Sequence, residues 1–118
     1  MAIASSTNPI QRLSPRAQRI NELLTTGVAH HQNGRLAEAD LLYKKVRKTD
    51  PNNVVAIMLS GVLTFQLGQF ELSLNLLSRA ISLKPDYAEA LCNRGNVLTE
   101  IKRFDEAMAD YDKAISLN

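Results

Sequence analysis

The sequence repeats itself with a period of about 34 residues, and five alignment columns keep the same phase. One column holds Gly27, Gly61 and Gly95. The other four columns hold Leu36, Phe70 and Phe104; Ala39, Ser73 and Ala107; Val46, Ala80 and Ala114; and Pro51 and Pro85. A repeat of this length indicates a solenoid, in which each unit buries its apolar face against its neighbours. This period constrains the architecture more than any other feature of the chain.

Turn residues between the columns predict where helices begin and end. A first helix starts at Ser14-Pro15, with serine as the N-cap and proline in the first turn, and ends at Asn33-Gly34. A second runs from Leu36 until Asp50-Pro51, because a residue before proline avoids the helical region. Further helices are expected over residues 54–67, 70–83, 87–101 and 104–117. Lys102 stands where the first two units have glycine, a substitution that costs up to about 1 kcal/mol in a left-handed turn.

These elements predict an all-α fold, an α-solenoid of three antiparallel helix pairs. The glycine column and the column of Ala39 are expected to let the two helices of each pair approach closely, while the column of Leu36 fills the gap beside the turn. We expect residues 1–13 to form an N-terminal arm and residues 14–118 to hold three repeats, at about 20–53, 54–87 and 88–118. The last helix lacks a polar capping helix, which would leave Met108, Tyr111 and Ile115 partly exposed and is typical of a fragment of a longer array.

Composition excludes several classes of function. The net charge of +2 is too small to indicate nucleic-acid binding, and no apolar run approaches the roughly 20 residues of a membrane helix. The basic cluster Lys44, Lys45, Arg47 and Lys48 is interpreted as the solvated face of a helix. Cys92 is the only cysteine, so an intrachain disulfide is excluded, and with no signal peptide evident we expect a cytoplasmic protein.

No catalytic or metal site is evident, so we expect neither an enzyme nor a cofactor. His30 and His31 are adjacent and point about 100° apart, whereas histidines that share a metal on a helix are three or four residues apart. Cys92 has no evident histidine base or second thiol. The carboxylates of the last helix are expected to face solvent; they are Asp105, Glu106, Asp110 and Asp112.

The repeat resembles the tetratricopeptide repeat over about residues 20–118. The third unit reads Leu91-x-x-Arg94-Gly95-x-x-Leu98 and then Ala107-x-x-x-Tyr111. The family's tryptophan is absent from every unit, and the first unit diverges most. The resemblance implies a right-handed superhelix whose first helices line a concave groove. The stretch from Ala88 to Asn96 also resembles the repeats of O-GlcNAc-transferase-type enzymes, whose recurring asparagine is matched by Asn93 but not by Thr25 or Leu59.

Placed on that groove, this chain offers apolar residues in its first two units and asparagines in its third. The expected peptide-binding residues are Leu24, Val28, His31, Val55, Met58, Leu59, Val62, Phe65, Asn93 and Asn96. An exposed apolar strip of this kind usually marks an interaction site. The alternative is that part of the strip is core or is covered by residues 1–13. Leu24 and Val28 stand where the family carries its carboxylate clamp, so acidic chaperone tails are not the expected ligand.

The resulting hypothesis is a non-enzymatic module that binds a protein or peptide. Two alternatives stay open: a substrate-recruiting region of a larger enzyme such as a glycosyltransferase, and a self-assembly module. Self-assembly would use the N-terminal arm or the uncapped last helix to form a homo-oligomer.

Overall fold

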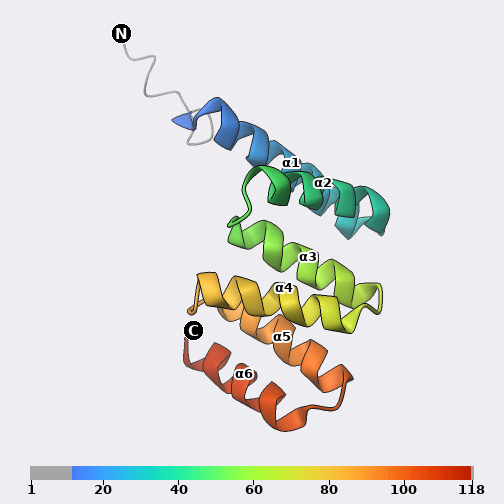
Figure 1. Cartoon of the computed structure of the whole chain (residues 1–118), viewed down its shortest axis with the longest axis vertical. Helices are drawn as coiled ribbons and strands as arrows, with labels where there is room; N and C mark the ends of the chain where they lie inside the picture. Colours follow the sequence, from blue (N-terminus) through green and yellow to red (C-terminus); the bar gives the residue numbers. More distant parts are fainter. Residues whose placement is uncertain (1–11, 118) are drawn as a thin grey trace.

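The computed structural model describes residues 12–117, which form six α-helices arranged in three successive pairs (Figure 1). The helices are α1 (Pro15–Gln32), α2 (Leu36–Thr49), α3 (Val54–Gln66), α4 (Phe70–Leu83), α5 (Ala88–Glu100) and α6 (Phe104–Ser116). Each pair is an antiparallel hairpin, and α2 packs on α3 as α4 packs on α5. The predicted all-α solenoid is confirmed, with helix ends within one residue of the expected ones. Nearly all of the arm predicted at residues 1–13 lies outside the described residues.

The helix ends have the predicted chemistry. Ser14 Oγ accepts a hydrogen bond of 3.1 Å from the Ala17 N–H and so caps α1. Gly34 and Gly68 have φ angles of +76° and +78°, and Lys102 has a φ of +64° at the equivalent turn. The third turn therefore has the left-handed conformation at a lysine, although glycine adopts this conformation most easily.

Each glycine of the repeated column faces a large side chain on the second helix of its pair. A Cβ atom at Gly27 would lie 2.7 Å from Tyr43, at Gly61 2.7 Å from Leu77, and at Gly95 2.6 Å from Tyr111. The side chain that fills the space thus stands at the same offset along the chain from each glycine. Glycine is therefore required by the large residue of the second helix, which occupies the space that another side chain would need.

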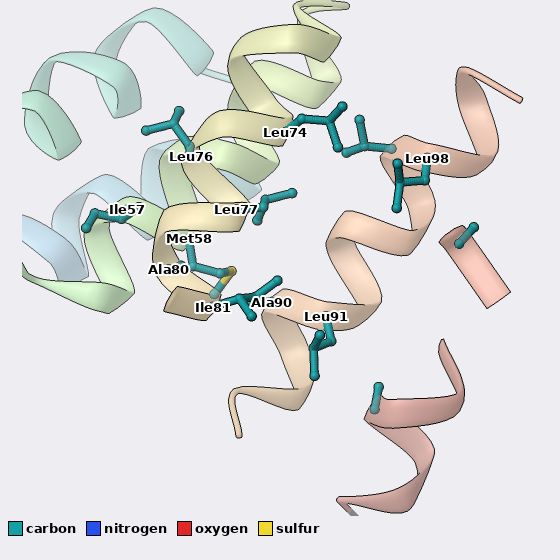
Figure 2. Close-up of a cluster of buried hydrophobic side chains, with 13 residues drawn as sticks. Ile57, Met58, Leu74, Leu76, Leu77, Ala80, Ile81, Ala90, Leu91 and Leu98 are labelled. Atoms are coloured by element: carbon teal, nitrogen blue, oxygen red, sulfur yellow. The ribbon is translucent and has the colours of Figure 1, made fainter. Parts of the chain in front are cut away.

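The core is continuous through the second and third pairs. Figure 2 shows this cluster, in which Ile57 and Met58 of α3 lie with Leu77 and Ala80 of α4 and Leu91 of α5. Smaller clusters join α1 to α2 and α3. This packing fixes the relative orientation of the first helices, which carry the candidate site.

Two expectations about the last pair are wrong. Asp110 does not face solvent: its carboxylate accepts two 2.7 Å hydrogen bonds from the Arg94 guanidinium, and the residue is only 6% exposed. The hydrogen bond to Asp110 is also the main reason that the pKa of Arg94 is raised. Phe104 does not fill the gap beside its turn but is exposed. In the second pair the equivalent Phe70 packs against the ring of Phe65, with 5.7 Å between the ring centroids. In the third pair Thr99 replaces that ring, so Phe104 lacks the contact.

The exposed face of α6 is confirmed. Met108 is 59% exposed and Ile115 is 71% exposed, whereas Leu74 and Ile81, their counterparts one repeat earlier, are each 9% exposed beneath α5. The same positions are therefore core at one junction and surface at the end of the described chain.

Candidate functional site: an apolar groove on α1 and α3

A groove of about 520 Å³ lies along α1 and α3. We call it the inner groove; its lining residues are Asn21, Leu24, Thr25, Val28, Ala29, Gln32, Val55 and Leu59. Six of these are on α1, at spacings of three and four residues that place them on one side of the helix. None of the eight is charged, so the groove offers apolar contact along its floor and neutral hydrogen-bonding groups at its edge.

The floor of the inner groove is held in place by the core beneath it. Leu24, Val28 and Leu59 are half-buried and pack against the buried residues Ala39 and Tyr43 of α2 and others of their cluster. Asn53 caps α3 by accepting a 3.0 Å hydrogen bond from the Ala56 N–H, which fixes the start of the helix that carries Val55. Val55 itself is exposed. The groove is therefore a preformed surface with a rigid base.

His31 borders this region as a structural link between helices. Its Nδ1 lies 3.0 Å from the hydroxyl of Tyr43 on α2, and its Nε2 lies 2.5 Å from Oε1 of Gln66 on α3. Burial raises the pKa of Tyr43 to about 12. With both ring nitrogens engaged, His31 stabilises the junction of the first two pairs, and it does not line the inner groove.

Four of the ten predicted site residues come together in the inner groove: Leu24, Val28, Val55 and Leu59. Val62 and Phe65 are half-buried and pack against the core of the second and third pairs. Met58 was expected to be exposed, and this is wrong: it is 2% exposed and lies in the hydrophobic cluster of Figure 2. The packing of α5 against α3 covers it, so the alternative that part of the strip is core holds for Met58.

The two predicted asparagines lie on α5, away from the inner groove. Asn93 Nδ2 contacts the sulfur of Met58 at 3.3 Å, and Asn96 Oδ1 accepts a 2.7 Å hydrogen bond from the Tyr111 hydroxyl. The Nδ2 of Asn96 makes no hydrogen bond to any described residue and belongs to an exposed side chain. Asn96 thus keeps a donor for a ligand that extends beyond the groove.

The other four residues of the inner groove, Asn21, Thr25, Ala29 and Gln32, are not among the ten predicted site residues, and Asn21 and Ala29 were not placed on the concave face at all. Helical spacing accounts for them, since Asn21 is three residues before Leu24 and Ala29 is four residues after Thr25. Asn21 also positions its neighbour, because its carbonyl accepts a 2.8 Å hydrogen bond from the Thr25 hydroxyl. A polar edge of this kind gives a groove orientation-specific contacts in addition to its apolar area.

Neither a metal-binding cluster nor a membrane-spanning helix is found in the described chain. Between residues 12 and 117 no group of three or more His, Cys, Asp or Glu could hold a metal ion. Over the same range no helix is both long and apolar enough to span a bilayer. Cys92 is an exposed free cysteine on α5.

Two family models match the sequence. The model described as "Tetratricopeptide repeat" matches residues 88–118, and the model described as "TPR repeat" matches residues 61–102. Among solved structures, the first TPR of Spaghetti (RPAP3) bound to the HSP90 peptide SRMEEVD superposes with a TM-score of 0.81 at 26% identity, covering 86% of this chain and 80% of that one.

Two curated relatives match much of this chain over part of their own length. The protein ycf37 of Pyropia yezoensis is 31% identical over 78 residues, which is 64% of this chain and 44% of that protein. The probable UDP-N-acetylglucosamine–peptide N-acetylglucosaminyltransferase SPINDLY of Hordeum vulgare is 32% identical over 95 residues, or 75% of this chain and 10% of that protein. The chain spans less than half the length of these relatives.

Proposed function

Because the chain belongs to the tetratricopeptide repeat family, we propose that it is a non-enzymatic protein-binding module that takes an apolar peptide segment in the inner groove. The observation that carries the proposal is the groove itself: a preformed surface of about 520 Å³ whose floor is Leu24, Val28, Val55 and Leu59. An exposed apolar surface of this shape is stabilised by an apolar partner, since burial removes its area from water.

The chemistry of the groove argues for a neutral, apolar ligand. The first TPR of RPAP3 was solved with the acidic peptide SRMEEVD. In this chain no lysine or arginine lines the inner groove. The resemblance to the family also implies that Leu24 and Val28 stand at the positions of its carboxylate clamp. An acidic peptide would lose its hydration there without gaining a charged partner, which is unfavourable.

Selection from a random peptide library displayed on phage tests the proposal. We expect the selected peptides to be rich in Leu, Ile, Phe and Met, and a labelled synthetic copy to bind in fluorescence anisotropy. Val55→Glu should weaken that binding at least tenfold, because it places a charge in the apolar floor. Val55 is preferred to Leu59 for this test because it is exposed, so the substitution leaves the core intact.

The matched control is Leu41→Glu, since Leu41 is an exposed leucine of α2 outside the inner groove. It should leave the affinity within about twofold. Equal losses in the two variants, or selected peptides that bind through acidic C-termini, would contradict the proposal.

A second candidate is the substrate-recruiting region of a larger enzyme. The observation that favours it is the similarity to the SPINDLY protein, of which the matched region is 10%. An antibody raised against this chain would test it on a blot of the source cells. A band far above 13.1 kDa that carries glycosyltransferase activity after immunoprecipitation supports this candidate, and a band at 13.1 kDa removes it.

Self-association is favoured by the exposed face of α6. Met108 and Ile115 occupy positions that are core in the preceding pair, so a second copy would bury them as α5 buries Leu74 and Ile81. Sedimentation velocity across a range of concentrations tests this. Dimers that disappear in Ile115→Lys support it, and a monomer at millimolar concentration contradicts it.

A further inference from the structure

The face of α2 that packs on the second pair departs from the repeat pattern. Asp40, Lys44 and Arg47 are spaced by four and three residues and therefore share one face of the helix. In α4, one repeat later, Leu74 and Ile81 stand in place of Asp40 and Arg47 and belong to the hydrophobic core. Charged residues of α2 thus occupy two positions that are apolar in α4, and burying a charge costs stability when it has no partner.

These residues surround a cavity of about 150 Å³ between α2, α3 and α4. We call it the junction cavity; its lining residues are Asp40, Lys44, Arg47, Ser60, Thr64, Leu67, Gln69, Leu72 and Leu76. It shares no residue with the inner groove. Any ligand of the junction cavity is therefore independent of the peptide proposed above.

Two buried polar atoms of residues that line the junction cavity have no hydrogen-bond partner within the described chain. They are Nε of Arg47 and Oγ of Ser60. Ser60 is 2% exposed, so its hydroxyl lies well below the surface. Buried polar groups are nearly always hydrogen-bonded, and an arginine stays charged at any physiological pH. Both atoms can donate a proton, so the missing partner is an acceptor. The expectation that the basic cluster forms a solvated helix face is therefore wrong for Arg47.

The charges around the junction cavity favour a negative ligand. Asp40 and Lys44 form a salt bridge of 2.8 Å and offset each other, which leaves the guanidinium of Arg47 as the uncompensated charge. No charged residue of α3 or α4 lines the cavity. Thr64 contributes no free donor, because its hydroxyl already donates to the carbonyls of Ser60 and Gly61.

The start of α4 adds a second source of positive potential. Gln69, the N-cap residue, and Leu72 of the first turn both line the junction cavity. Gln69 makes no side-chain cap hydrogen bond, and the first N–H groups of a helix lack acceptors within it. Helix N-termini with free N–H groups bind anions. Glu71 is in the same turn but lines a different cavity, together with Arg94 and Arg103.

We propose that the junction cavity binds a small oxyanion, a phosphate or carboxylate group, through the guanidinium of Arg47, the hydroxyl of Ser60 and the start of α4. The cavity volume of about 150 Å³ leaves room for an ion of this size. An oxyanion supplies the acceptor that both unpartnered atoms lack. The guanidinium binds such groups with favourable geometry.

Titration with inorganic phosphate, followed by NMR of the ¹⁵N-labelled chain, tests the proposal. Sodium chloride at matched ionic strength is the reference, and sodium acetate in parallel distinguishes a phosphate from a carboxylate site. We expect saturable shifts of the Arg47 Nε–Hε signal and the Leu72 amide with phosphate, acetate or both. Shifts that never saturate, or that chloride reproduces, mean that the cavity holds water only and overturn the proposal.

Three variants locate the binding. Arg47→Ile installs the residue type of the equivalent position in α4, so the fold is retained while the anion contact is lost; binding should weaken at least tenfold. Ser60→Ala removes the buried hydroxyl and should also weaken it, whereas Lys45→Ala, a neighbouring exposed cation outside the cavity, should leave it within about twofold. Equal binding by Arg47→Ile and the original chain would contradict the assignment. Since the inner groove is untouched, failure here leaves the proposed peptide binding unaffected.

Discussion

Replacing Gly61 with alanine places a methyl group where Leu77 already lies. An added Cβ would be 2.7 Å from Cγ and 2.8 Å from Cδ2 of Leu77, closer than such atoms come in real proteins. Leu77 is fully buried, so it has little room to move. Overpacking of this kind costs about 1–3 kcal/mol, and the better helix propensity of alanine returns about 1 kcal/mol. We therefore expect a net destabilisation of about 0–2 kcal/mol.

The sign of the effect should change when the obstructing side chain is removed. Leu77→Ala alone is expected to cost about 2–5 kcal/mol because it leaves a cavity in the core. In that background Gly61→Ala meets no side chain of this size and should stabilise the fold by about 1 kcal/mol. The coupling energy between the two positions is thus about 1–3 kcal/mol, well above the deviation found for independent sites.

Urea unfolding followed by circular dichroism at 222 nm measures the four proteins of this cycle. The same concentration of trimethylamine N-oxide in every sample keeps the Leu77→Ala proteins folded at zero urea. If Gly61→Ala stabilises by about 1 kcal/mol in both backgrounds, the close approach of α3 and α4 does not require glycine, and the reasoning for the repeated column is refuted.

Three further predictions concern turns, a buried ion pair and pH. Lys102→Gly should stabilise the fold by up to about 1 kcal/mol in urea unfolding, and Gly68→Lys should destabilise it by a similar amount, because both positions have a positive φ. Asp110→Leu should cost about 2–4 kcal/mol of unfolding free energy, because it leaves the Arg94 guanidinium unpaired. Adding Arg94→Ser gives both positions the residues of the second repeat. The double variant should recover at least half of that loss in the same assay. Stability should fall by about 2 kcal/mol between pH 10 and 12, since the unfolded state loses the Tyr43 proton first, whereas nearly full stability holds below pH 9. Unfolding of Tyr43→Phe over this range should lack that loss.

The repeat period was sufficient to predict the helices and the close contacts within each pair. Turn chemistry at Gly34 and Gly68 fixed the helix ends, and the glycine column marked a tight contact within each pair. These features are local or recur in every unit, so one sequence contains three independent copies of the evidence. The fold was therefore predictable without knowledge of the surroundings of any single residue.

Residues that depend on the packing between pairs were less predictable. Helical spacing placed Met58 beside Leu59 on the inner face, but whether α5 covers it depends on the angle between successive pairs. Aspartate side chains usually face solvent, and the sequence therefore predicts a solvent-facing Asp110. A signal was present, since Arg94 and Asp110 are separated by the same offset along the chain that joins Gly61 to Leu77.

The groove was predicted in part for the same reason. Leu24, Val28, Val55 and Leu59 follow from the face of two helices, whereas the placement of Asn93 and Asn96 beyond the groove follows from the position of α5 relative to α3. The charged junction around Arg47 was visible as a basic cluster. Its burial could not be inferred, because that depends on the three helices that meet there.

The most direct test of the peptide-binding groove is a chemical-shift map of the ¹⁵N-labelled chain titrated with a peptide selected from the phage library. The largest shifts are predicted at Leu24, Val28, Val55 and Leu59, with smaller ones at Asn21 and Gln32. Shifts that cluster instead on α6 or on the junction cavity, with the inner groove unchanged, would contradict the assignment of α1 and α3 as the binding surface.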